Sequence, residues 1–176
     1  MAMQYDVSSV HLNSTGFAFL GRTRVKGMVV TSTATGGTVT LWDTATGVTA
    51  ATYAQTAYTV TVTLATHGLA TGNRVGISFN TATGVSDTNG NYIITVVDAN
   101  TFTITDINSR TIAALTLCAY VASPANGKTQ WHFTLDTAAA AGTTNIVFPG
   151  EGILIETGIY LGMTTTNIPA ATIFYG

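Results

Sequence analysis

The amino-acid sequence predicts an all-β protein: an antiparallel, jelly-roll-like β-sandwich with a second small β-barrel or sandwich module inserted in one of its loops. Three observations lead to this fold class. Roughly a fifth of the residues are Thr, which together with Gly, Ala and Val displace the helix formers Glu, Lys, Gln and Leu. Short segments of alternating apolar and polar residues recur along the chain. Gly, Asn or Asp bounds these segments, as is typical of the strands of a sandwich or barrel.

The alternating segments predict about ten to twelve short strands. They comprise residues 24–30, 38–42, 58–64, 74–79, 92–97, 101–105, 115–121, 130–135, 152–156, 158–162 and 172–175. The tetrapeptide Thr-Ala-Thr-Gly occurs between them at residues 33–36, 44–47 and 81–84. Because Gly supplies the positive φ that tight hairpins need, these tetrapeptides predict turns.

The charge content of the chain is low. Charged residues make up 8% of the sequence, where a typical soluble domain has about 25%. A net charge of -2 gives no basic surface for a nucleic-acid backbone, so we expect no nucleic-acid partner. We also expect no membrane span and no Sec signal, because no apolar run approaches about 20 residues and Met1 to Asp6 has no basic start.

Few charges also mean little repulsion between copies of the chain. We therefore expect a homo-oligomer, with a trimer favoured, because much uncharged strand surface must be covered. Light scattering checks this expectation, and a monomer of 18.2 kDa at every concentration would contradict it.

The middle of the chain carries three linked motifs within residues 57–121. They lie in the runs HGLATGNRV, residues 67–75, and NGNYIITVVDANTFTITD, residues 89–106. These runs resemble the small β modules that recur in tail and head proteins of tailed phages. The resemblance implies that residues 57–121 form an inserted domain, and that the junctions lie within residues 49–55 and 124–128.

The flanks resemble short structural proteins of podovirus-type phages. The similar segments are SVHLNSTG (9–16), RTRVKGMVVTSTATGGTVTLWD (22–43) and FPGEGILIETGIYLGMTTTNIPAATIFYG (148–176). The resemblance implies an outer sandwich of residues 1–56 and 122–176. It also implies a virion protein made in the bacterial cytoplasm, foremost a decoration or cement protein on the head exterior that binds the major capsid protein or another virion protein.

Two alternatives stay open. A tail, collar or fibre component would have the same composition and the same module. A carbohydrate-binding adhesin would use exposed aromatic side chains as stacking platforms, and the candidates are Tyr53, Tyr58 and Trp131.

The sequence offers no catalytic set, and we expect neither an enzyme nor a metal or cofactor. His11, His67 and His132 lie in separate segments, and none has a second ligand at metal-binding spacing. His67 precedes Gly68 in a turn, so we expect its ring to bond loop backbone. The chain lacks a Gly-x-Ser-x-Gly elbow.

Two further segments have simple structural interpretations. The oxygen-rich run Asp87 to Asn91 begins like a calcium loop, but Tyr92 stands where that loop needs Gly, so a β-turn is favoured. Cys118 alternates with apolar neighbours in a strand pattern. We expect a buried thiol there rather than a reactive one.

Charged residues mark the candidate interaction sites. Arg22, Arg24 and Lys26 alternate, which predicts one strand face; it is either solvated or docks an acidic patch on a neighbouring virion protein. Glu151 and Glu156 are expected on opposite faces of their strand, which argues against paired-carboxylate catalysis and assigns them to surface or subunit contacts.

The C-terminal segment is predicted to be a strand covered on both faces. Ile173 and Tyr175 would project to one face and Phe174 to the other. One face would cover the sandwich core, and the other would contact a neighbouring subunit. Because alternation does not say which face is which, all three residues are candidate subunit contacts.

Overall fold

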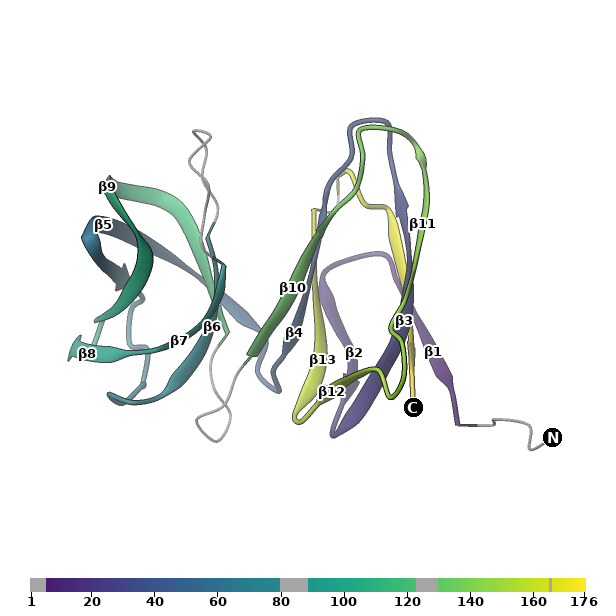
Figure 1. Ribbon diagram of the computed structural model, residues 1–176, viewed down its shortest axis with the longest axis horizontal. Helices are drawn as coiled ribbons and strands as arrows, with labels where there is room; N and C mark the ends of the chain where they lie inside the picture. Colours follow the sequence, from purple (N-terminus) through teal and green to yellow (C-terminus); the bar gives the residue numbers. More distant parts are fainter. Residues whose placement is uncertain (1–5, 80–88, 123–129, 165) are drawn as a thin grey trace. The chain divides into compact units, whose positions relative to one another are not determined.

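The computed structural model describes residues 6–79, 89–122, 130–164 and 166–176, and for residues 114–122 and 131 the backbone alone. These residues form fourteen strands and no helix, which confirms the predicted all-β class. The chain divides into two compact units (Figure 1). The first unit comprises Met1–Ala45 and His132–Gly176, and the second comprises Thr46–Trp131.

The first unit contains two sheets. One, called the β3 sheet below, has the strand order β1 (Ser8–Leu12), β14 (Ala170–Tyr175), β3 (Thr23–Ser32) and β11 (Gly142–Val147). The short strand β12 (Ile153–Ile155) also pairs with β3. The other, the β4 sheet, has the order β10 (Gln130–Asp136), β4 (Thr38–Asp43), β13 (Gly158–Met163) and β2 (Gly16–Leu20).

The core of this unit lies between its two sheets. Met28, Val30 and Ile173 of the β3 sheet pack in one cluster with Leu41 and Leu161 of the β4 sheet. Figure 1 shows the two sheets facing each other. A core enclosed by two antiparallel sheets confirms the predicted sandwich.

Three strands of this unit escaped prediction, namely β1, β2 and β11. All three lie at sheet edges, and most of their residues are exposed or half-buried. Strands β1 and β11 contain few apolar residues, so their alternation is weak in the sequence. Strand β2, with the sequence Gly-Phe-Ala-Phe-Leu, is apolar at four of five positions and therefore shows no alternation with polar residues.

The second unit is one curled sheet. Its strands are β5 (Val48–Thr63), β9 (Thr101–Ala122), β6 (Arg74–Phe79) and β7 (Gly90–Ile93), while β8 (Thr95–Asp98) pairs with β9. The antiparallel pairing of β5 and β9 runs from Val48 opposite Ala122 to Thr63 opposite Thr101. Phe102, Val62 and Ile77 belong to its separate hydrophobic core.

The second unit is wider than the predicted insert of residues 57–121. Strand β5 continues through the expected junction at residues 49–55, because its first half pairs with the second half of β9. The inward residues of that half are Ala51, Tyr53 and Gln55. Ala51 is small and Gln55 is polar, so the apolar alternation of this half of the strand is too weak to predict it from the sequence. The other expected junction, residues 124–128, lies outside the described residues.

These boundaries predict the outcome of two deletions. Replacing residues 46–131 by a short Gly-Ser link should leave cooperative melting of the first unit, because its core cluster contains no residue from that range. Replacing residues 57–121 should give a less soluble protein, since Val48 to Thr56 would keep a strand whose partner is gone. Circular dichroism and melting of both variants check this, and loss of cooperative melting in the longer deletion would contradict it.

Candidate docking surface

The three cations singled out in the sequence lie beside the two glutamates. The Nε atom of Arg22 is 3.2 Å from Oε2 of Glu156, and that of Arg24 is 3.9 Å from Oε2 of Glu151. Lys26 donates from Nζ to the backbone oxygen of Glu151 at 3.3 Å. The cause is the pairing of β12 with the start of β3. The cations predicted as a docking face and the glutamates predicted as surface or subunit contacts therefore form one mixed-charge cluster.

This arrangement corrects two expectations. Arg22 precedes β3 and is not part of the strand. Glu151 precedes β12 in a turn, so strand alternation does not send it to the face opposite Glu156. Both ion pairs are solvent-exposed, and such pairs contribute about 0 to 1 kcal/mol. The basic residues are thus not an unpaired cationic face, and Lys26 alone of the three has no carboxylate partner among the described residues.

Asp43, at the end of β4, holds the turn that carries Glu156. Its side chain is buried, and its Oδ2 accepts from Glu156 N at 2.7 Å. Its Oδ1 accepts from the backbone and hydroxyl of Thr157 at 2.8 and 2.7 Å and from Gly158 N at 3.3 Å. No pattern in the sequence singles out Asp43 as a functional residue. The only signal was a carboxylate directly after an apolar strand.

A β-bulge in β3 decides which side chains face outward. Phe174 pairs with Gly27 and Tyr175 with Val25, so Lys26 is the extra residue. Val25 and Met28 are both fully buried although they are three residues apart. The bulge therefore leaves Lys26 and Gly27 between two inward residues and turns Val29 outward. A Cβ atom on Gly27 would lie 2.6 Å from the backbone oxygen of Ile146, so this position accepts only Gly.

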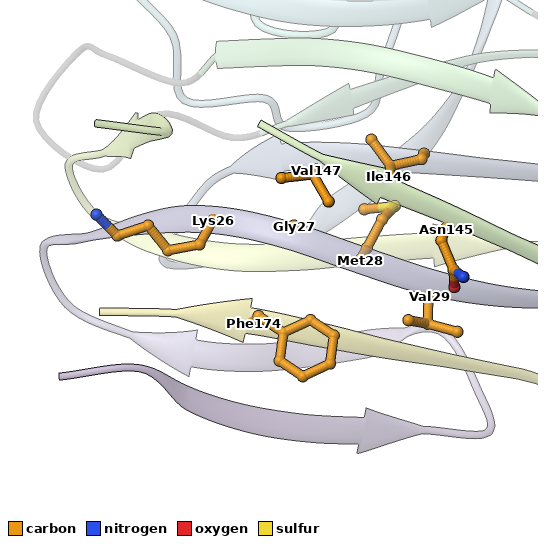
Figure 2. Close-up of a pocket in the computed structure, with 8 residues that line it drawn as sticks. All are labelled: Lys26, Gly27, Met28, Val29, Asn145, Ile146, Val147 and Phe174. Atoms are coloured by element: carbon orange, nitrogen blue, oxygen red, sulfur yellow. The ribbon is translucent and has the colours of Figure 1, made fainter. Parts of the chain in front are cut away.

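The outer side of the β3 sheet carries a trough of about 400 Å³ (Figure 2). Figure 2 shows Lys26 at one end of the row of lining residues and Val29 and Asn145 at the other. The complete lining is Lys26, Gly27, Met28, Val29, Asn145, Ile146, Val147 and Phe174. Only Lys26 among these residues is ionisable. The trough therefore suits an apolar group that ends in, or lies beside, an anionic one.

The C-terminal strand divides its residues as the alternation predicts. Ile173 is fully buried and Tyr175 packs on the same core, with its ring 5.0 Å from that of Phe19. Phe174 lines the trough on the other side. Ile173 is therefore a core residue, and its assignment as a subunit contact is wrong because its side chain has no exposed surface. Phe174 remains accessible for such a contact.

The histidines occupy unrelated environments. His67 accepts from Leu69 N at Nδ1 (3.0 Å), and its Nε2 lies 2.9 Å from the backbone oxygen of Asp98, which confirms that its ring bonds loop backbone. His11 lies 3.0 Å from the hydroxyl of Thr172. Within the described ranges no three His, Cys, Asp or Glu residues gather as metal ligands. The start of the calcium-like run, Asp87 and Thr88, lies outside those ranges, as does the side chain of Cys118.

His132 lies half-buried on β10. Burial lowers the pKa of its ring below the usual 6.5, and the negative charge of Asp43 opposes this shift. Its Nε2 atom is buried and has no hydrogen-bond partner among the described residues. A neutral ring is thus part of the folded state.

This environment predicts a pH dependence of stability. Since the pKa of His132 is lower in the folded chain, the unfolded chain takes up the proton first as the pH falls below about 6.5. The free energy of unfolding should therefore decrease below that pH. Melting curves between about pH 8 and pH 5 should show a smaller decrease for His132→Gln than for the wild type or the control His11→Gln. An equal decrease in all three would contradict the assignment.

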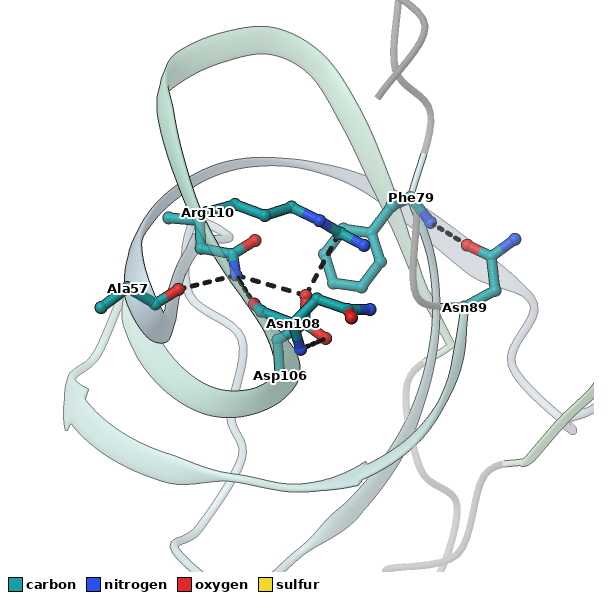
Figure 3. Close-up of polar contacts among 7 residues, drawn as sticks. Ala57, Phe79, Asn89, Asp106, Asn108 and Arg110 are labelled. Carbon is teal, nitrogen blue, oxygen red and sulfur yellow. Dashed lines mark hydrogen bonds and ion pairs between the residues drawn. The ribbon is translucent and has the colours of Figure 1, made fainter. Parts of the chain in front are cut away.

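The second unit has a polar cluster where β5 and β9 bulge (Figure 3). The two N–H bonds of Gln55 Nε2 are shared among three acceptors, which are the backbone oxygens of Ala57 and Asn108, at 2.9 and 2.7 Å, and Oδ2 of Asp106 at 3.3 Å. Arg110 lies 3.2 Å from the same Asp106 oxygen. Burial and, to a smaller extent, the charge of Asp106 raise the pKa of Tyr92 to about 12. The bonds from Gln55 to Asn108 and Asp106 connect β5 to β9, which is a structural role.

The candidate carbohydrate platforms differ in exposure. Tyr53 is 3% exposed and packs edge-on against Phe79, so it cannot stack on a sugar. Tyr58 is 55% exposed. The side chain of Trp131 lies outside the described part of the chain.

Neither the comparisons with known proteins nor the helix content of the chain gives further information on the class of protein. No protein-family model, characterised protein or solved structure matches this chain. Within the described residues no helix is long and apolar enough to cross a membrane. The fold and the surface define an all-β chain with a largely apolar trough on the outside of one sheet, in which Lys26 is the one ionisable residue.

Proposed function

We propose that this chain is a non-enzymatic virion structural protein of a tailed phage, and that the outer side of its β3 sheet docks onto a neighbouring protein of the particle. The observation that carries the proposal is the trough. Val29, Val147 and Phe174 are apolar side chains that line it on the outside of a sheet whose other side already covers a core. Apolar surface of this kind is typical of protein contact sites.

The chemistry of the trough favours docking over catalysis. A catalytic site needs a nucleophile with a base, an acid and base pair, or a metal. Lys26 is the one ionisable residue of the trough lining, and its ammonium group donates to a backbone oxygen. The low charge of the whole chain adds support, because uncharged surface favours an assembled state.

A head decoration protein is the particular role that we propose, with the major capsid protein as partner. The motifs of residues 9–16, 22–43 and 148–176 support a virion component, and the same motifs suit a tail, collar or fibre protein. A carbohydrate adhesin is less well supported. Tyr53 is buried, so Tyr58 would have to stack on a sugar without a second platform from Tyr53.

Cryo-electron microscopy of purified particles of the encoding phage tests this proposal. The expected result is density for the two-unit chain at regular sites on the head, with the β3 sheet toward the shell. Density on the tail or collar would support a virion role and overturn decoration. Absence of the chain from particles, checked by mass spectrometry, would overturn the virion role itself.

A further inference from the structure

Strand β11 leaves one edge of the β3 sheet open. Among the described residues it pairs with β3 alone, from Gly142 opposite Ser32 to Val147 opposite Gly27. Phe148 N donates to Lys26 O at 2.9 Å. This bond fixes which residues of β11 direct their backbone groups toward β3. In an antiparallel ladder every second residue bonds the neighbouring strand. Thr143, Asn145 and Val147 therefore direct their backbone N–H and C=O groups to the open edge.

In the part of the chain that the structure describes, this edge lacks the usual protection against strand pairing. Residues 137–150 contain no charged side chain, and Val147 is 82% exposed. Sheet edges are normally protected by charges, bulges or covering segments. An uncharged edge with an exposed Val is suited to receive another strand.

The open edge and the trough belong to one surface. Asn145 and Val147 line the trough and also carry the outward-facing backbone groups. In an added antiparallel strand, residues opposite these two would project on the trough side, because paired residues share a face. Apolar side chains there would cover Val29 and the space above Gly27.

Lys26 supplies the charge preference of this surface. Its ammonium group, which carries three protons, donates one bond, to the backbone oxygen of Glu151, and forms no ion pair among the described residues. An added strand would lie about 10 Å from β3, two strand spacings away. The side chains of Lys and Glu together span that distance. An acidic residue beyond the position opposite Val147 would therefore meet Lys26.

The carboxylate is expected from a different protein. Glu151 and Glu156 pair with Arg24 and Arg22. Asp43, Asp98 and Asp106 accept hydrogen bonds within the chain. These groups are already engaged, so among the described residues a second copy of the chain offers Asp6 and Asp136 as the remaining side-chain carboxylates to complement Lys26.

We propose that β11 accepts an extended segment of a different protein as an added antiparallel strand. In that segment two apolar residues lie two and four positions after an acidic residue. The acidic residue bonds Lys26, and the apolar residues lie opposite Val147 and Asn145. This inference rests on the proposed docking function and names the chemistry of the docked partner.

Three labelled synthetic peptides test the proposal by fluorescence anisotropy with the full chain. Their sequences are Glu-Thr-Val-Thr-Val-Thr and the versions with Gln or Lys in first place, all with blocked ends. We expect the Glu peptide to bind about twofold to fivefold more tightly than the Gln peptide, as an exposed ion pair allows, and the Lys peptide to bind most weakly. Lys26→Met should abolish the Glu preference. The control Arg74→Met, an exposed cation on β6, should retain it.

Backbone pairing is tested separately. Asn145→Pro removes an N–H that faces the open edge and no bond to β3, so binding of all peptides should fall at least about tenfold while the fold persists. Asn145→Ala keeps that N–H and should bind normally. If Asn145→Pro does not fold, Val147→Glu is the second variant, since its site is exposed and its charge should repel the Glu peptide.

Several results would overturn the inference. These are no saturable binding of the Glu peptide, equal binding of the Glu and Gln peptides, or binding that survives Asn145→Pro. Self-association that Asn145→Pro abolishes would identify a second copy as the occupant and overturn the different protein. Binding of the chain to purified particles separates the two proposals. If the chain binds particles but no peptide, the proposed function stands and the added strand on β11 is wrong. If the chain binds peptide but no particle, the proposed function is wrong.

Discussion

Replacing Asp106 by Ala is expected to lower the free energy of unfolding of the second unit by about 3 to 5 kcal/mol, the usual cost of breaking a buried ion pair from one side. Asp106 is 3% exposed and the side chain of Arg110 is 14% exposed. Without the carboxylate, Arg110 keeps a charge that is largely shielded from water. The amide of Gln55 and the backbone N–H of Asn108 lose an acceptor at the same time. Calorimetry of the full chain measures the effect.

Two further variants control this prediction. Asp98→Ala removes an exposed carboxylate that accepts one backbone hydrogen bond from Asn100, and should cost only about 1 kcal/mol. The double variant Asp106→Leu with Arg110→Met removes both charges of the ion pair and should be more stable than Asp106→Ala. If the double variant were the less stable of the two, burial of an uncompensated charge would not be the cause.

Replacing Ile173 by Ala is expected to cost the first unit about 2 to 5 kcal/mol. Its side chain is fully buried in the sandwich core, and its backbone lies in β14 between Val10 of β1 and Met28 of β3. Phe174→Ala is the matched control on the same strand. Phe174 is only half-buried on the trough side, so its truncation should cost less stability. Thermal and urea unfolding of both variants measure the difference.

Deletion of residues 173–176 should have a larger effect than either substitution. It removes the last part of β14 and leaves the start of β3 and of β1 without a partner between them. We expect insoluble protein or loss of particle binding. A truncated chain that melts at the wild-type temperature would show that this strand end is a dispensable edge.

The contrast between Ile173 and Phe174 shows how much of the fold can be predicted from the sequence. Alternation in a strand is a local property of the backbone, so it assigned Ile173 and Tyr175 to one face and Phe174 to the other. It could not say which face was the core, and Ile173 was for that reason also considered as a subunit contact. Only the packing of β14 against the β4 sheet assigns Ile173 to the interior.

The cluster of charges shows a second limit. Arg22, Arg24 and Lys26 stand more than 120 residues before Glu151 and Glu156, and no local pattern predicts that β12 pairs with β3. The bulge at Lys26 and Gly27 also shifts the alternation of β3 by one residue. Without the bulge, Val29 would point inward. The trough thus depends on an irregularity that pattern analysis does not detect.

By itself the sequence determined the all-β class, most strand positions and the backbone bonds of the His67 turn, because composition, alternation and turn residues act over a few neighbouring positions. The tertiary structure decided the boundaries of the two units, the pairing of Arg22 with Glu156, and the joining of the trough to the open edge of β11. These features are contacts between distant segments. Their partners are selected by the free energy of packing the whole chain, in which each local pattern is compatible with several pairings.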